Sequence, residues 1–462
     1  MSSGPRRRFW PHPLTVWRWH FFAGLFCLPF VAFLSLTGAV YLFKPQLDAV
    51  LDRPYDRLVP PGTPLATPEQ EVRAALAAVP GATLLAFELP PHPGDAARVI
   101  LDRDGDAIRI YVHPRTLAIL HQVREETRFE RVVFKLHGQL LLGNLGSAIM
   151  EMVASWTIVL VLTGLVLWWP RRSAALPASG PAGSGPGGVV WPRLSAPGRR
   201  RWRDLHAVSG AWVSLVLVLF LLSGLPWSFV WGHALARVEN AAGRLAAVRD
   251  WQIGAVPARD IAAARPVPAP SSMPGMDMDT PAPAATPDAL SGLDAVVATA
   301  ARLGFPPPVL VTPPIPSAAS SAGPVPAWRV RSDTEDRPRR IAARVSSAGA
   351  VLSVERFRDK GPVERLVGYG VAAHEGHLFG WFNQLLNLLV ALLLLAMSLA
   401  ATVLWLRRRP PGHLGAPPRR DRRLAPGALL LVLPLALLLP ELAAALLLLA
   451  CASALAPRLS RS

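Results

Sequence analysis

The stretch Phe129–Arg172, FERVVFKLHGQLLLGNLGSAIMEMVASWTIVLVLTGLVLWWPRR, determines the fold class of this chain. Its second half, Ser147–Trp169, contains a single charged residue, Glu151, near its start. A helix of about 20 apolar residues crosses the roughly 30 Å hydrocarbon core of a bilayer. Two tryptophans end this half and arginines follow, which is the order expected at a membrane interface. The stretch therefore predicts a membrane-spanning helix, with His137 just before it.

Three further apolar stretches, 21–43, 207–230 and 382–406, have the length of a membrane span. The composition, with 51% hydrophobic and 17% charged residues, agrees with a membrane protein that has soluble inserts. The formal net charge of +17 could suggest nucleic-acid binding, but the arginines stand beside the apolar stretches. We therefore interpret the charge as a topology signal and expect no nucleic-acid partner.

Two long regions outside the spans share one order of predicted elements. In residues 44–146, Thr67-Pro68-Glu69-Gln70 predicts the start of a helix, and alternating apolar runs separated by turns such as Asp104-Gly105 predict a small antiparallel sheet. Residues 231–381 repeat this order after a Pro/Ala-rich stretch at 256–287 whose composition predicts disorder. The chain thus predicts two tandem units, each made of a span, a small α+β domain and a span.

Arginine-rich segments at the N-terminus and in the loops 170–206 and 407–423 predict that these parts lie in the cytoplasm and both α+β domains outside it. The last apolar stretch, 424–457, is too long for one span and contains Pro434 and Pro440. We expect a hairpin of two short helices there; one kinked helix is the alternative. The predicted fold is an α-helical membrane protein divided as follows: N-terminus and first span 1–43, first domain 44–146, second span 147–169, basic loop 170–206, third span 207–230, second domain region 231–381, fourth span 382–406, basic loop 407–423, hairpin 424–457 and cytoplasmic tail 458–462.

Each of the four spans has a histidine near one end. His20 and His206 precede the first and third spans on the cytoplasmic side, whereas His137 and the pair His374 and His377 precede the second and fourth on the outer side. Two neutral imidazoles on facing helices are suitable axial ligands for haem b, which needs no C-x-x-C-H attachment motif. A proton or metal-ion pathway and ordinary interfacial polar residues are the alternatives.

Five segments resemble the PepSY-associated transmembrane family, whose members are often described as iron-regulated or iron-uptake membrane proteins. They are WRWHFFAGLFCLPF…LTGAVYLFKPQLD at 17–48, LHGQLLLGNLG at 136–146, ASWTIVLVLTGLVLWWPRR at 154–172, WRDLHAVSGAWVS…SGLPWSFVWG at 202–232 and HEGHLFGWFNQ at 374–384. The inserts resemble PepSY domains, with YVHPRTLAIL at 111–120 similar to their closing strand pair and VSSAGAVLS at 345–353 keeping its turn.

The resemblance implies that His20, His137, His206 and His374 ligate two haems b, with His377 as the alternate to His374. Some family members are reductases of the bacterial inner membrane that reduce ferric siderophores or ferric iron on the periplasmic side. The resemblance therefore implies a membrane metal reductase in iron uptake with periplasmic PepSY domains. The chain contains no nucleotide-binding or flavin-binding motif, so the electrons must come from an external flavoprotein or quinol.

Two other functions stay open at this point. Met273, Met276 and Met278 form a cluster of thioethers suited to Cu(I), so copper could replace iron as the substrate, although a low-complexity loop explains the same residues. Alternatively, the PepSY-like domains bind a peptide or inhibit a protease and the helices serve as an anchor. A transporter is disfavoured because the spans contain Glu151 and Glu441 as their only acids, both near predicted ends or breaks.

Overall fold

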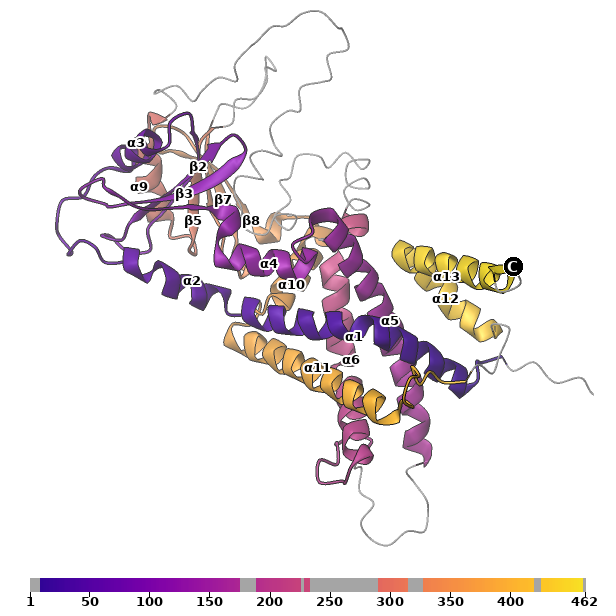
Figure 1. Cartoon of the computed structure of the whole chain (residues 1–462). Helices are drawn as coiled ribbons and strands as arrows, with labels where there is room; N and C mark the ends of the chain where they lie inside the picture. The colour runs from indigo at the N-terminus through magenta and orange to yellow at the C-terminus, as the bar shows by residue number, and fades with distance from the viewer. Residues whose placement is uncertain are drawn as a thin grey trace, which may run out of the picture. The chain divides into compact units, whose positions relative to one another are not determined.

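The computed structural model describes residues 9–174, 188–225, 228–232, 290–314, 327–418 and 425–459 (Figure 1). The chain divides into two compact units, which we describe separately. The membrane unit comprises residues 1–42, 134–241 and 385–462, and the sheet unit comprises residues 43–133 and 242–384.

Within the described residues, four helices are long and apolar enough to cross a membrane, which confirms the four predicted spans. Each helix is longer than the apolar stretch within it, because the tryptophan- and arginine-rich flanks continue the helix. His20 and His206 consequently lie inside helices rather than before them. The four helices are α1 (Pro13–Tyr41), α5 (Gly143–Ala174), α6 (Arg199–Gly224) and α11 (Trp381–Arg408), of which the membrane unit contains the first three and most of the fourth.

Small side chains bring α1 and α5 close together in antiparallel orientation. Gly24 lies next to Leu160, and the buried Cys27 lies next to Val153, with its Sγ 3.8 Å from the Val153 carbonyl oxygen. Lipid gives apolar helices little drive to associate, so close backbone approach between small residues stabilises such a pair. The helices α6 and α11 pack through a separate apolar cluster that contains Val213, Val390 and Leu394.

The C-terminal apolar stretch forms two helices, α12 (Pro426–Leu438) and α13 (Pro440–Leu459), which contact each other. The chain breaks at Leu439 because Pro440 has no N–H to continue α12, whereas the first position of a helix suits proline. Pro434, the other proline in this stretch, lies inside α12. Leu439 and Leu442 are buried against Ile158 of α5, so both helices belong to the membrane unit.

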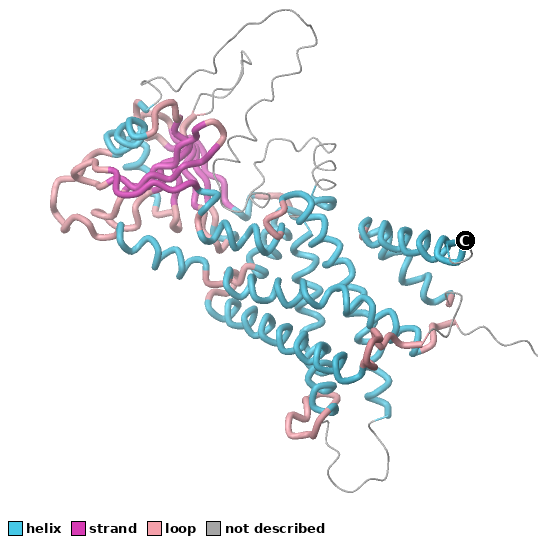
Figure 2. The backbone as a smooth tube through the Cα atoms, viewed as in Figure 1, coloured by secondary structure: helices cyan, strands magenta, loops and turns pink. Residues whose placement is uncertain are grey.

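The sheet unit contains one eight-stranded antiparallel sheet with the strand order β4-β3-β2-β1-β5-β6-β7-β8. Its strands are magenta in Figure 2. The sequence predicts two small sheets, and the structure joins them through β1 and β5, with Phe87 opposite Val311. Separate sheets would each leave an unpaired edge strand, and pairing these two strands satisfies both edges. The strands are β1 (Thr83–Glu88), β2 (Ala97–Arg103), β3 (Asp106–Val112), β4 (Ile119–Arg124), β5 (Val309–Thr312), β6 (Trp328–Ser332), β7 (Ile341–Val345) and β8 (Val351–Arg356).

The helices α3 (Pro68–Ala78) and α9 (Leu293–Leu303), which precede the two strand groups, cover one face of this sheet with a shared core. Phe87, Val99 and Trp328 are fully buried in it. The predicted start of α3 is confirmed: the Thr67 hydroxyl accepts from Gln70 N–H, and the Gln70 side chain accepts from Thr67 N–H. This shared core makes the two repeats one folding unit.

Short helices link the sheet to the long helices. The chain enters the first repeat through α2 (Lys44–Asp52) and η1 (Arg53–Tyr55). It leaves the two repeats through η2 (Glu125–Thr127) and α4 (Phe129–Gln139), and through η6 (Phe357–Asp359) and α10 (Pro362–His374). A further turn of 3-10 helix, η5 (Arg337–Arg339), lies between β6 and β7.

Candidate functional site

The four long helices α1, α5, α6 and α11 enclose a cavity of about 370 Å³ within the membrane unit. This volume falls in the usual range of small-molecule and cofactor pockets. Most of the wall is apolar, and Val31, Leu160 and Leu217 are typical of it. The lining also includes the imidazoles of His20 and His206. A cavity with an apolar wall and two convergent polar groups has the character of a ligand site.

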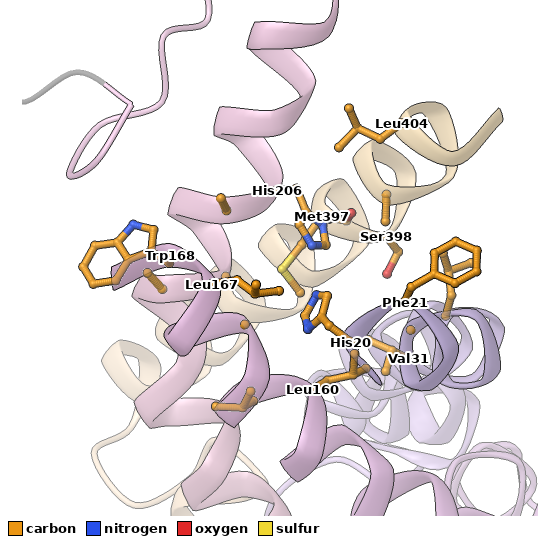
Figure 3. A pocket seen from close by; sticks show the side chains of 18 of the residues that line it. His20, Phe21, Val31, Leu160, Leu167, Trp168, His206, Met397, Ser398 and Leu404 are labelled. Atoms are coloured by element: carbon orange, nitrogen blue, oxygen red, sulfur yellow. Dashed lines mark hydrogen bonds between the residues drawn. The ribbon is translucent and has the colours of Figure 1, made fainter. Parts of the chain in front are cut away.

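His20 on α1 and His206 on α6 bring their rings together inside this cavity (Figure 3). The ring centroids are 6.2 Å apart and the ring planes are inclined at 78°. The two histidines come from helices separated in the sequence by the whole first domain and the second span. The pairing therefore results from the tertiary fold. His20 and His206 are also the two histidines that the sequence analysis predicted on the cytoplasmic side of the membrane.

A threonine on α5 determines which ring nitrogen of neutral His20 carries the proton. His20 Nδ1 lies 3.0 Å from Thr163 Oγ1. The Thr163 hydroxyl donates its own hydrogen to the Val159 carbonyl oxygen at 2.7 Å, so towards His20 it acts as an acceptor. His20 Nδ1 therefore carries the proton, and Nε2 of the neutral imidazole carries the lone pair.

His206 acquires the same tautomer from a backbone group. Its Nδ1 lies 3.1 Å from the carbonyl oxygen of Met397 on α11. A carbonyl only accepts, so His206 donates through Nδ1–H and presents the lone pair at Nε2. Metal-ligating histidines almost always donate the other ring N–H to an acceptor in this way. In their neutral forms both histidines thus have the tautomer that ligation of a metal centre through Nε2 requires.

Two glycines leave room for imidazole rings at helix contacts. A Cβ added to Gly164 on α5 would lie 3.2 Å from Cε1 of His20, and one added to Gly38 on α1 would lie 3.1 Å from Cε1 of His137. Both distances are shorter than an ordinary van der Waals contact, so any larger residue would displace the ring. The small residues at these positions therefore serve the histidines in addition to helix packing.

His137 on α4 has a set of contacts that matches those of His20. Its Nδ1 lies 3.0 Å from Thr37 Oγ1, and the Thr37 hydroxyl donates to the Phe33 carbonyl oxygen at 2.9 Å. By the same reasoning, Nδ1 of His137 carries the proton. The Thr-Gly pair of α1 thus contacts His137 of α4, and the Thr-Gly pair of α5 contacts His20 of α1. The repeated arrangement indicates that His137 has the same kind of role as His20.

His374 and His377 belong to the sheet unit. His374 is the last residue of α10, and a turn at Glu375 and Gly376 follows it, so His377 lies in a loop rather than one helical turn further along. That His374 ligates haem, with His377 as the alternate, stays a prediction.

His377 lies close enough to Glu335 to act on its charge. Burial raises the pKa of Glu335, but the neighbouring charges of Lys44, Arg340 and His377 outweigh burial and lower it to about 2. His377 is thus in the environment of an ion-paired carboxylate.

The methionine cluster of Met273, Met276 and Met278 lies outside the described residues, as does the Pro/Ala-rich stretch 256–287. Among the residues that the structure describes, no group of three or more His, Cys, Asp or Glu side chains is placed to hold a metal ion. The histidine pair in the cavity is accordingly the strongest candidate site in the described part of the chain.

Several residues of this site were not predicted from the sequence. The Met397 carbonyl is a backbone group, so the sequence contains no sign of it. Arg199, Arg203 and Arg408 also line the cavity, although the sequence assigned arginines of this kind to topology alone. The recurrence of Thr-Gly at 37–38 and 163–164 was visible in the sequence and could have identified the hydrogen-bond acceptors of the histidines.

A comparison with protein families agrees with the layout of the chain. The family model of the PepSY-associated TM region matches residues 17–408, which is most of the 462 residues and includes both groups of strands and the four long helices apart from the first turn of α1. A search of curated proteins found no match. The extent of the family match shows that this chain, a multi-pass membrane protein that also contains an antiparallel sheet, belongs to the PepSY-associated transmembrane family.

Proposed function

We propose that this protein holds a haem b between His20 and His206 and conducts electrons through the membrane to a ferric acceptor. The observation that supports this most is the 6.2 Å separation of the two ring centroids across an apolar cavity. His20 and His206 would hold the haem between them, each through its ring Nε2. The close approach of the two imidazoles would suit them to hold one haem.

The rest of the cavity also fits this group. The cavity wall is mostly apolar, as a macrocycle requires. Gly210 on α6 has no side chain, so Met397 of α11 can approach it, and the Met397 sulfur lies 3.1 Å from the position that a Cβ would occupy. The guanidinium groups of Arg199, Arg203 and Arg408 would neutralise the two propionate carboxylates. Arg203 also bonds Asp204 at 2.8 Å, which orients its side chain.

Bound haem b supplies one-electron exchange between ferric and ferrous iron. The residues of the chain determine how readily this exchange occurs. Thr163 and the Met397 carbonyl accept from the Nδ1–H groups and thereby raise the basicity of Nε2, which favours the ferric state. The apolar wall excludes water and has the opposite effect, because it disfavours the extra positive charge of ferric iron.

The matching contacts of His137 support a second haem b, and the pairing of His137 with His374 stays a prediction. The complete proposal is a bacterial inner-membrane protein with both termini in the cytoplasm and its PepSY-like repeats in the periplasm. It receives electrons from an external flavoprotein or quinol and reduces ferric iron or a ferric siderophore. The arginine-rich loops support this orientation.

The test begins with the purified full chain in detergent. We expect a b-type spectrum in the dithionite-reduced state and about two haems per chain by pyridine haemochrome. His206→Ala should lose one haem, since one axial ligand is removed. His413→Ala is the matched control, because His413 lies in an exposed segment after α11, away from the cavity lining.

A colourless protein from haem-replete cells would refute the proposal and favour the PepSY-anchor function instead. Equal loss of haem in the His206→Ala and His413→Ala variants would show that the assay reports general instability. Retention of full haem content in His206→Ala would refute the assignment of this axial pair.

A further inference from the structure

The helix α10, which precedes the fourth span, is held to the sheet unit by one of its faces. Gly368 lies against the ring of Phe357 in η6, where an added Cβ would come within 2.6 Å of the ring. Val371 on the same face is fully buried. Just beyond the end of the helix, the buried Glu375 pairs with Arg337 of η5 at 3.5 Å. These contacts fix the orientation of α10 within the sheet unit.

The outer face of α10, opposite to these contacts, is exposed and carries no charge. It consists of Pro362, Val363, Leu366 and Tyr369. Leu366 is 73% exposed, the most of the four. The charged residues Glu364 and Arg365 are half-buried at the sides of this face, and Glu364 pairs with Lys360 at 2.8 Å. A helix of a soluble protein has charged or polar residues on the side that faces water, so α10 has the reverse pattern.

One buried side chain joins the end of α10 to the beginning of α11. The side-chain amide of Asn383 donates to the Ala373 carbonyl oxygen at 3.1 Å and accepts from the Leu378 N–H at 3.2 Å. Asn383 is only 4% exposed, so water does not compete for these bonds. Because Asn383 belongs to the first turn of α11, this turn and α10 keep a fixed position relative to each other.

The first turn of α11 carries the aromatic residues that are expected at a membrane surface. Trp381 is 72% exposed, and Phe382 and the preceding Phe379 are exposed as well. The helix that follows is apolar and long enough to cross a membrane. Tryptophan at the end of such a helix lies at the level of the lipid headgroups. The bonds of Asn383 therefore hold α10 beside the place where the chain enters the bilayer.

We propose that α10 lies in the lipid–water interface, with its outer face in contact with phospholipid, and that it anchors the sheet unit to the membrane surface. An uncharged helical face with charged residues at its sides is typical of helices that lie in this interface. The ring of Tyr369 contacts lipid there while its hydroxyl stays hydrated. The proposal depends on the membrane-spanning character of α11 and is independent of the proposed function.

Phospholipid is the occupant that the neighbouring residues favour. The outer face of α10 and the exposed aromatic side chains of Trp381 and Phe382 are linked through Asn383, so one surface can cover both. The bilayer already covers α11, and it extends in every direction around the span. The sheet unit thereby gains a second attachment besides the spans, which restricts its rotation relative to the membrane.

The test is spin labelling of the full chain in vesicles of phosphatidylcholine and phosphatidylglycerol. Cys451→Ala removes the exposed native cysteine, and the buried Cys27 stays in place. Into this background Val363→Cys, Leu366→Cys or Tyr369→Cys is introduced singly and labelled with a nitroxide. Power saturation then measures collisions of each label with oxygen, which concentrates in lipid, and with a water-soluble nickel chelate. The background without an added cysteine shows whether Cys27 is labelled.

Two further positions serve as references. Leu389→Cys is the reference for lipid, because Leu389 is exposed within the apolar part of α11. Ala77→Cys is the reference for water, because Ala77 is an exposed residue of α3, away from α10 in the sheet unit (Figure 1). Labels at Val363, Leu366 and Tyr369 should collide more with oxygen than with nickel, as at Leu389. The order should be reversed at Ala77.

Three results would overturn the proposal. More collisions with nickel than with oxygen on the outer face would place it in water. Few collisions with either reagent would place it against protein, and dipolar broadening of the spectra would identify that protein as a second copy of the chain. Contact with lipid at Tyr369 alone would show that α10 does not lie along the interface.

Discussion

Replacement of Thr163 with valine removes one hydroxyl from the cavity wall and keeps the shape of the side chain. His20 Nδ1–H then loses the acceptor that lies 3.0 Å away. Loss of such a partner of a metal-ligating histidine lowers affinity for the bound group about 10- to 100-fold. This corresponds to about 1.4–2.7 kcal/mol. We therefore expect weaker retention of haem by Thr163→Val during purification or on dilution.

The same substitution should raise the midpoint potential of the haem held by His20. The hydrogen bond to Thr163 makes Nε2 more basic and so stabilises the ferric state more than the ferrous state. A tenfold change in the balance of the two states corresponds to about 59 mV for one electron. Potentiometric titration followed in the visible spectrum measures this shift, and an upward shift of some tens of millivolts is expected.

Thr157→Val is the matched control on the same helix. The Thr157 hydroxyl also donates to the carbonyl four residues earlier, Val153, at 2.7 Å, and Thr157 also lines the cavity. Thr157 makes that bond to the backbone and not to a histidine, so the midpoint potential of Thr157→Val should equal that of the unaltered chain within experimental error. If Thr163→Val leaves the potential and the haem affinity unchanged, or if Thr157→Val shifts the potential equally, the proposed role of Thr163 is refuted.

Two further predictions concern a glycine and a carboxylate. Gly164→Ala places a Cβ 3.2 Å from the His20 ring, so the ring must move and haem content should fall. Gly224→Ala on α6, where a Cβ meets nothing within 4 Å, is the control. Equal haem content in both variants would contradict the steric argument. Glu88 has a pKa lowered to about 2, so its contribution to stability is present above the unfolded pKa of about 4.3 and is lost as the pH falls towards 2. Thermal unfolding between pH 6 and pH 2.5 should show this loss in the unaltered chain, of roughly 3 kcal/mol at most, and a smaller pH dependence in Glu88→Gln. A variant with the same pH dependence as the unaltered chain would show that Glu88 is not the group that titrates.

Hydropathy and charge predicted the four spans because the length of an apolar run is a local property of the sequence. The order of helix and strands within each repeat was predicted for the same reason, since alternation and turn residues act over a few positions. The helix ends differed, as α1 and α6 begin before His20 and His206 rather than after them. The aromatic and basic residues that flank a span lower its mean hydropathy, so the predicted span ends there, although the helix continues through them.

The sequence by itself determined the membrane class of the protein, its spans and the histidines near their ends. Only the tertiary structure brought His20 to His206, Thr163 to His20 and the Met397 carbonyl to His206, contacts that join residues as far as 191 positions apart. It also joined two strand groups into one sheet. The physical reason is that hydrogen-bond partners, ring spacing and charge compensation depend on distances in space, whereas hydropathy and turn signals depend on neighbours along the chain.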